Sequence, residues 1–228
     1  VTTGQVVLAG EVKSEAYLDV QEIAREVIKK IGYTKSEYMF EAASCGILSA
    51  IHEQSPDINQ GVEKKDPYKQ GAGDQGMMFG FACDETPELM PLPIALAHSL
   101  ARRIDEARES KDLPWLRPDG KAQVTIRYSG ATPTVEKLVL AVAHDEKATA
   151  EQVRSEAIEK IVKPVLEKYK FDLPKDENII INGTGLWHIP GPESDAGLTG
   201  RKIVVDTYGG YARVGGGAFS GKDPSKVD

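Results

Sequence analysis

The chain has 228 residues, of which 40% are hydrophobic and 28% are charged, and its formal net charge is −7. This length allows one large domain or two small ones, and the composition is that of an ordinary globular protein. The acidic balance argues against a general nucleic-acid binder, because such proteins present basic surfaces. Any anionic ligand must therefore be held by a local cluster of cations.

Two further global features predict a cytoplasmic protein. The two cysteines, Cys45 and Cys83, are far apart and have no metal-ligand spacing, which fits a reducing compartment. The sequence has no apolar run of membrane-spanning length and no signal-peptide pattern. It starts without Met, almost directly in strand-like sequence, and stops just after a glycine-rich stretch, so we expect a piece of a longer protein.

The first quarter of the chain predicts the order ββαβ. Strands are predicted over 5–12, 14–18 and 45–51. A helix is predicted over 19–31, because apolar residues recur there at helical spacing and Gly32 follows them.

The next stretch, 53–76, is polar, rich in glycine and without periodicity. A structureless loop of this length is uncommon inside a compact domain. Its composition leaves two interpretations open, a disordered linker and a lid or binding loop over a site.

The middle of the chain predicts a complete βαββαβ unit. Its elements are a strand at 77–83, a helix at 91–110 with two prolines in the first turn, strands at 123–129 and 136–144, an amphipathic helix at 148–168 and a strand at 178–183. Another strand is predicted over 202–210. The first quarter matches the last part of this unit, so the sequence predicts an internal repeat.

Four polar stretches lie beside the predicted strands. They are GAGDQG (71–76) with Asp74, LRPDGK (116–121) with Asp119 and Lys121, ESDAGLTGRK (193–202) with Asp195, Arg201 and Lys202, and GGGAFSGKDPSK (215–226) with Lys222. Each by itself also fits an ordinary turn or a solvated charge pair. Together, cations beside glycine turns and several carboxylates suit an anionic nucleotide with divalent cations.

The last stretch resembles a phosphate-binding P-loop only in part. Gly216 to Lys222 fits G-x-x-x-x-G-K, but Asp223 follows where the motif needs Ser or Thr to bind Mg²⁺. A carboxylate there would repel the phosphates, so a P-loop kinase is disfavoured against an unrelated phosphate-binding loop. The four histidines, His52, His98, His144 and His188, have no metal spacing, and we expect them at the surface or in the core.

Several motifs together resemble the S-adenosylmethionine synthetase (methionine adenosyltransferase) family of the bacterial type. They are GAGDQGMMFGFA, INQG, LPWLRPDGKAQVT, GLTGRKIVVDTYGG and GGGAFSGKDPSKVD, and the resemblance covers essentially the whole chain. It implies an α+β fold of repeated βαββαβ domains about a pseudo-threefold axis, with the first and third repeats incomplete here. The implied divisions are a partial N-terminal repeat (1–53), a mobile active-site loop and linker (54–70), the central repeat (71–190) and the start of a C-terminal repeat (191–228).

The resemblance also implies a reaction. Methionine sulfur attacks C5′ of ATP and displaces the whole tripolyphosphate, which is then hydrolysed to pyrophosphate and phosphate. The implied cofactors are Mg²⁺, with two ions expected, and K⁺. The implied assembly is a homodimer, or a dimer of dimers, with active sites at the subunit interface, and neither nucleic acid nor membrane is an implied partner.

The matching positions carry the following implied roles. Catalysis and triphosphate binding fall to Lys121, Arg201, Lys202 and Lys222. The other ATP contacts are Asp119, Gly120, Leu186, Trp187, Asp195 and Ala218, with the Trp187 ring against adenine. Methionine contacts are Glu11, Gln54, Asp195 and Lys226, Asp74 is a further active-site residue, and Asp228 is a Mg²⁺ ligand. The gate over the site comprises Gln54, Ser55, Pro56, Asp57, Ile58, Asn59, Gln60 and Gly61.

The chain departs from the family pattern in two respects. The family carries an upstream His-Pro-Asp-Lys motif, with a catalytic histidine and metal-binding carboxylates, and most of a C-terminal domain that this sequence does not include. We therefore expect the chain alone to have little or no activity and its full-length parent to be active. The alternative is a non-catalytic homologue that binds nucleotide or polyphosphate. The retained polar residues argue against it; they are Asp119, Lys121, Asp195, Arg201, Lys202 and Lys222. A purely structural module would bind no ATP at all.

Overall fold

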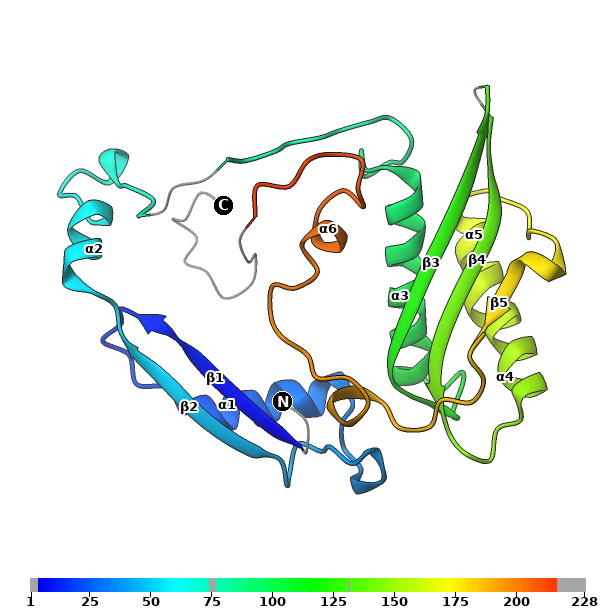
Figure 1. Cartoon of the computed structure of the whole chain (residues 1–228), viewed down its shortest axis with the longest axis horizontal. Coiled ribbons are helices and arrows are strands. Elements are labelled where there is room, and N and C mark those ends of the chain that lie inside the picture. Colours follow the sequence, from blue (N-terminus) through cyan, green and yellow to red (C-terminus); the bar gives the residue numbers. More distant parts are fainter. Residues whose placement is uncertain (1–3, 74–76, 131, 217–228) are drawn as a thin grey trace.

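The computed structural model describes residues 4–73, 77–130 and 132–216. Two parts lie beside one another in Figure 1. A pair of long strands with one helix forms the N-terminal part, and a three-stranded sheet with helices forms the central part. Mixed helix and sheet content confirms the predicted α+β class. Among the described helices, none is long and apolar enough to cross a membrane.

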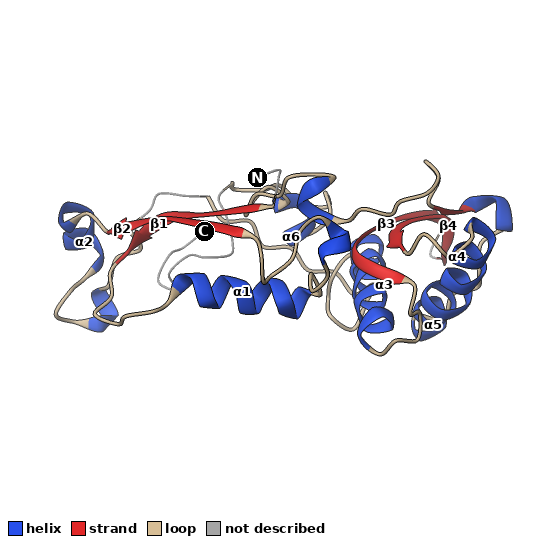
Figure 2. Cartoon of the chain, turned by 90° about the horizontal axis from the view of Figure 1, so that it is seen from below, coloured by secondary structure: helices blue, strands red, loops and turns tan. Residues whose placement is uncertain are grey.

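The N-terminal part is a βαβ unit. Strand β1 (Gln5–Val12) pairs in parallel with β2 (Gly46–Glu53), and helix α1 (Val20–Ile31) connects them. The Asp19 side chain accepts two backbone N–H groups at the start of α1, and Gly32 ends the helix in the left-handed region. The helix covers one face of the strand pair (Figure 2). A small core is formed by Ile28, Tyr33, Tyr38, Phe40, Ala42 and Cys45.

The central part is a three-stranded sheet with helices on one face. Its strands are β3 (Leu116–Ser129), β4 (Thr132–His144) and β5 (Ile179–Ile181); β3 and β4 are antiparallel, and β4 and β5 are parallel. Helices α3 (Leu92–Glu109), α4 (Ala150–Ala157) and α5 (Lys163–Lys168) pack against the same face (Figure 2). The interior is aliphatic and includes Leu96, Leu100, Leu138, Leu140, Ile161 and Leu166.

A π-helical turn, Ile158–Val162, joins α4 to α5. Pro164 lacks the N–H that an α-helix would donate to Lys160, which leaves that carbonyl without a helical partner. The Nε of Arg103 on α3 donates to the Lys160 carbonyl at 2.9 Å instead. The predicted amphipathic helix over 148–168 therefore forms, with one irregular turn at the proline.

Short helices occupy several connections. They are α2 (Pro56–Val62), α6 (Ile203–Asp206) and single 3₁₀ turns at Ser36–Tyr38, Pro67–Lys69, Asp176–Asn178 and Gly191–Glu193. The stretch 53–76 thus contains α2 and a 3₁₀ turn, and is not structureless over its described residues.

Three predicted strands were wrong. Residues 14–18 and 77–83 have no regular structure, and residues 203–206 of the predicted strand 202–210 form the single turn α6. The backbone hydrogen bonds of a strand need a neighbouring strand, and no described strand pairs with these segments. Within the described residues, the central unit therefore begins at α3, and its order is αββαβ.

Candidate active site

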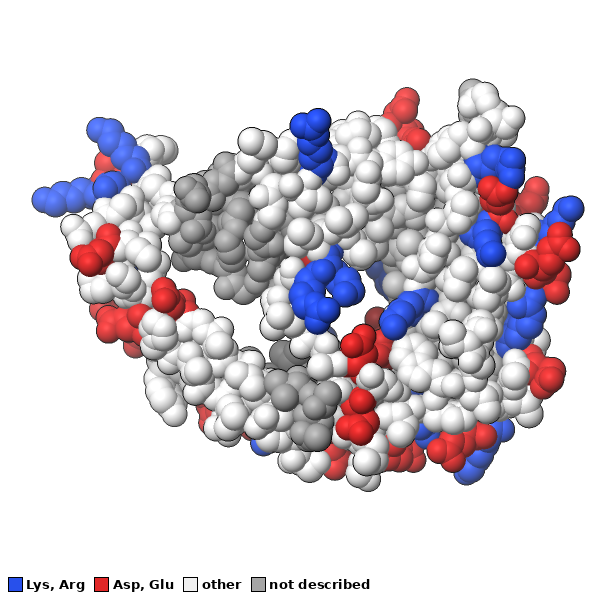
Figure 3. All heavy atoms as spheres, viewed as in Figure 1, with Lys and Arg blue, Asp and Glu red and all other residues white. Residues whose placement is uncertain are grey.

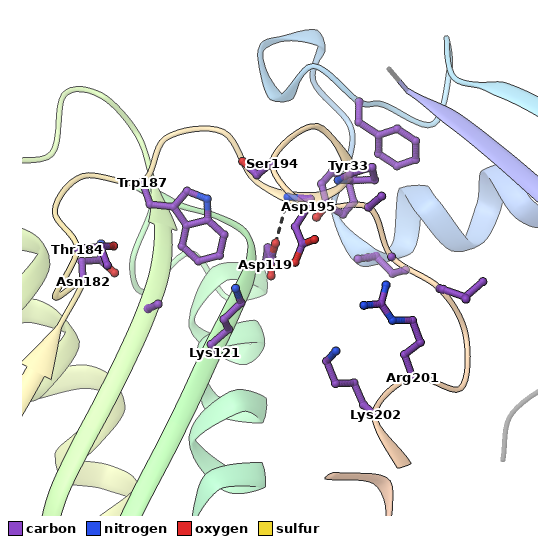
Figure 4. Close-up of a pocket in the computed structure, with 18 of the residues that line it drawn as sticks. Tyr33, Asp119, Lys121, Asn182, Thr184, Trp187, Ser194, Asp195, Arg201 and Lys202 are labelled. Atoms are coloured by element: carbon purple, nitrogen blue, oxygen red, sulfur yellow. Dashed lines mark hydrogen bonds between the residues drawn. The ribbon is translucent and has the colours of Figure 1, made fainter. Parts of the chain in front are cut away.

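A cavity of about 730 Å³ opens between the two parts of the molecule. Its walls come from the end of α1 and the loop after it, from β3 and β4, and from residues 182–202 (Figure 4). Seven residues singled out in the sequence line it: Asp119, Lys121, Leu186, Trp187, Asp195, Arg201 and Lys202. The fold thus brings together side chains from positions about 80 residues apart.

Asp119 joins strand β3 to the loop that carries Asp195. Its Oδ2 accepts the backbone N–H of Gly191 at 3.1 Å (Figure 4). Asp119 has a φ of 82°, in the left-handed region, where Asp is among the better tolerated residues. This conformation is held by the strand on one side and the loop on the other, which is typical of a functional position.

Tyr33 lies behind this contact and closes one wall of the cavity. A Cβ atom on Gly191 would stand 2.3 Å from the Tyr33 Oη, and Gly191 itself has a φ of 70°. Burial of the phenol, followed by the nearby Asp119 carboxylate, raises the pKa of Tyr33 well above its ordinary value. The hydroxyl therefore stays protonated throughout the physiological range. Tyr33 did not emerge from the sequence, because a tyrosine after a helix-ending glycine carries no distinguishing signal.

Trp187 and Lys121 form a second wall. The Lys121 Nζ lies 5.6 Å from the centre of the Trp187 ring, within the range of a cation–π contact. The indole Nε1 of Trp187 donates to the Ile189 carbonyl at 2.9 Å, which fixes the ring plane. The site thus offers a flat aromatic surface directly beside a cation.

Arg201 and Lys202 add two more cations across the cavity from Trp187 (Figure 4). In the space-filling view, Lys and Arg side chains gather around the hollow between the two parts, with carboxylates at one rim (Figure 3). Among the described residues, no carboxylate lies within 4.0 Å of Lys121, Arg201 or Lys202, whereas many other cations of the chain are paired. A chain with net charge −7 therefore carries a local cationic cluster suited to a polyanion.

Several predicted site residues do not line this cavity. Gly120 does not line the cavity, and it packs against α3, where an added Cβ would be 3.3 Å from Ile104. Glu11 lies near the far end of β1, with its carboxylate 3.6 Å from His52. Gln54 and Asn59 line a separate hollow. Figure 1 shows helix α2 at this end of the β1–β2 pair. The predicted gate, 54–61, corresponds largely to the helix α2 and does not touch the cavity.

Five predicted residues lie outside the described part of the chain: Asp74, Ala218, Lys222, Lys226 and Asp228. Within the described ranges, no group of three or more His, Cys, Asp or Glu side chains is arranged to hold a metal. The cavity offers the carboxylates of Asp119 and Asp195, and Mg²⁺ is commonly bound by one or two carboxylates together with substrate phosphates. The described residues fit a metal that arrives with a polyphosphate.

Comparison with known proteins identifies three matching family models. The model for the central domain of S-adenosylmethionine synthetase matches residues 69–187, and those for the C-terminal and N-terminal domains of the same family match 189–228 and 1–56. The S-adenosylmethionine synthases of Cytophaga hutchinsonii and Flavobacterium johnsoniae are 57% and 58% identical to this chain over all of its length. That of Parabacteroides distasonis is 56% identical. The chain spans 57–58% of the length of these relatives.

Proposed function

This chain belongs to the S-adenosylmethionine synthetase family, and from that premise we propose that the protein makes S-adenosylmethionine from ATP and L-methionine. One observation supports the assignment of this activity to particular residues. Lys121, Arg201 and Lys202 line one cavity with an aromatic ring at its side, and none of the three has a carboxylate partner among the described residues. A nucleoside triphosphate has the matching parts, a flat base and a polyanionic chain.

In the proposed orientation, adenine lies against Trp187 and the triphosphate extends toward the three cations. Stacking of a base on an aromatic side chain contributes about 1–3 kcal/mol. Asp119 and Asp195 lie between these two ends and are suited to accept hydrogen bonds from ribose hydroxyls or from the methionine amine. Gly191, held by Asp119, keeps the loop that bears Asp195 in place.

In the proposed reaction, negative charge develops on the leaving group. When the methionine sulfur bonds to C5′, the C5′–O bond breaks and its electron pair leaves with the tripolyphosphate. Fixed cations along the phosphate chain stabilise the charge that develops there, and this is the role we assign to Lys121, Arg201 and Lys202. Lys222 is proposed as a fourth such cation. Mg²⁺ bound with the phosphates would neutralise further charge, and K⁺ is proposed as a second type of cofactor.

The methionine side of the site is proposed at Glu11, Gln54, Asp195 and Lys226, with residues 54–61 as a gate that excludes water on closing. Because Glu11 and Gln54 do not line the cavity, the complete site needs either closure of this end of the β1–β2 pair or a second subunit. We propose a homodimer or a dimer of dimers, located in the cytoplasm.

The test uses the full-length protein with ATP, methionine, Mg²⁺ and K⁺, and measures S-adenosylmethionine, pyrophosphate and phosphate by chromatography. We expect product formation that falls at least about tenfold in Arg201→Met, because one charged contact to the leaving group is lost. Lys168→Met is the control, because it also removes a cation, but one that lies outside the cavity, 5.5 Å from the centre of the Tyr169 ring. ATP binding without any product would favour the non-catalytic homologue instead.

A further inference from the structure

His144 is a buried histidine that does not line the candidate active site, yet it holds the backbone of Trp187. It is the last residue of β4 and is 1% exposed. Its backbone N–H donates to the Trp187 carbonyl at 2.9 Å. Its ring Nε2 lies 3.4 Å from the Trp187 backbone nitrogen, which donates to it. Both polar backbone groups of Trp187 are therefore held by this one residue.

The partners of the ring indicate which of its two nitrogens donates and which accepts. The Nδ1 atom of His144 lies 3.0 Å from the Asp145 carbonyl oxygen, which can only accept a hydrogen bond. Nδ1 therefore carries the proton, and in a neutral ring Nε2 is left as the acceptor for Trp187. A ring protonated on both nitrogens would place a donor against the Trp187 N–H. The arrangement thus needs the tautomer that carries its proton on Nδ1.

Neighbouring groups hold the residue after Trp187 as well. The Nδ1 of His188 lies 3.2 Å from the His144 carbonyl oxygen, and the two imidazole rings meet edge to face with centres 4.7 Å apart. The buried guanidinium of Arg117 on β3 donates to the His188 carbonyl. The segment that carries Trp187 is therefore attached to both long strands of the central sheet.

We propose that His144 is a positioning residue that holds Trp187 in the orientation in which it receives the adenine base, a role that rests on the proposed function. The indole is fixed at its outer end by Ile189 and at its backbone by His144. Loss of the ring acceptor leaves a backbone N–H of Trp187 without its partner, and the segment then relaxes away from the position that the base requires. His144 acts through Trp187 and has no role at the reacting atoms.

Two substitutions separate this role from simple packing. His144→Phe keeps an aromatic ring of similar volume but removes the acceptor. His144→Gln keeps a side-chain oxygen that can accept the Trp187 N–H. Leu138→Val changes a fully buried residue of the same strand, paired with β5 and remote from Trp187, and controls for a general loss of stability.

The experiment uses the full-length protein labelled with 5-fluorotryptophan and observed by ¹⁹F NMR. The resonance absent from Trp187→Phe is that of Trp187. We expect His144→Phe to shift or broaden this resonance, and to raise the KM for ATP about tenfold with kcat within about twofold. His144→Gln is expected to restore both readouts to within about threefold of the unmodified protein, and Leu138→Val to change neither.

The proposal is overturned if His144→Phe leaves the Trp187 resonance and the KM for ATP unchanged, or if Gln and Phe have equal effects. It is also overturned if kcat falls while KM does not, since that result would place His144 in the chemical step. If the Trp187 resonance responds to His144→Phe and is restored by Gln, but ATP causes no change in any variant, the positioning contact stands and the proposed function fails.

Discussion

The Oδ2 atom of Asp119 accepts the backbone N–H of Gly191 at 3.1 Å across 72 residues of sequence. This contact attaches the start of the 3₁₀ turn Gly191–Glu193 to strand β3. Asp119 has a left-handed backbone conformation at the point of contact, with a φ of 82°. Such conformations cost about 1–3 kcal/mol and persist where surrounding structure holds them. The contact thus fixes the position of the loop, and with it Asp195 at the cavity wall.

Substitutions of Asp119 should distinguish the effect of its charge from the effect of its hydrogen bond to Gly191. Asp119→Asn keeps an acceptor oxygen and tolerates the left-handed conformation, so we expect its stability to stay within about 0.5 kcal/mol of the unmodified protein. Asp119→Ala loses the acceptor and should be about 1–2 kcal/mol less stable in urea unfolding. We expect Ala to lower kcat/KM for ATP more than Asn does. Equal stability of the two variants would show that the Gly191 contact contributes nothing measurable.

Gly191 should tolerate no side chain. Gly191→Ala introduces a Cβ 2.3 Å from the Tyr33 hydroxyl at a φ of 70°, so we expect a loss of about 2–4 kcal/mol in unfolding free energy. Gly130→Ala is the matched control, because Gly130 has a φ of 63° but no heavy atom of another described residue, its chain neighbours aside, within 4 Å of the position that an added Cβ would take. Its loss should be about 1 kcal/mol, from backbone conformation alone. A similar loss in both variants would exclude the clash with Tyr33.

The three cavity cations should bind polyphosphate independently of any turnover. We expect Lys121→Met, Arg201→Met and Lys202→Met each to weaken binding of inorganic tripolyphosphate about tenfold or more in calorimetry, because each removes a charge-assisted contact. Binding should weaken as salt concentration rises, and less steeply in each variant. Lys168→Met should bind as the unmodified protein does. Unchanged affinity in all three variants would contradict the assignment of the phosphate end.

Glu156 should contribute to acid sensitivity. The Trp115 Nε1 donates to its carboxylate at 2.7 Å, and this bond is the main cause that lowers the pKa of Glu156 below its ordinary value of 4.5. A carboxyl with a lowered folded pKa stabilises the fold above its unfolded pKa, and this contribution is lost as pH falls through the folded pKa. Glu156→Gln should therefore flatten the stability curve below about pH 4.5, by about 0.5–1 kcal/mol in total. Identical curves would show that the Trp115 contact does not depend on charge.

Much of the fold follows from local pattern in the sequence. The helix α1 was predictable because its apolar spacing and its terminal Gly32 agree, and the Asp19 cap at its start is equally local. Strands β3 and β4 have strong apolar or alternating patterns that a buried sheet requires. The strands predicted at 77–83 and 202–210 have equally suitable residues, but a strand also needs a neighbour to bond with, and sequence pattern does not provide that information.

The sequence alone was enough to predict which cations could bind a polyanion. Lys121, Arg201 and Lys202 lie beside glycine-containing turns whose backbone can approach a ligand closely. Only the tertiary structure decided which contacts fix the positions of the site residues. Tyr33 behind Gly191, the Asp119 contact to the loop, and His144 behind Trp187 all join positions more than 40 residues apart. Such contacts depend on how strands and loops pack in space, and a hydrogen bond between distant segments leaves no periodic signal in the order of residues.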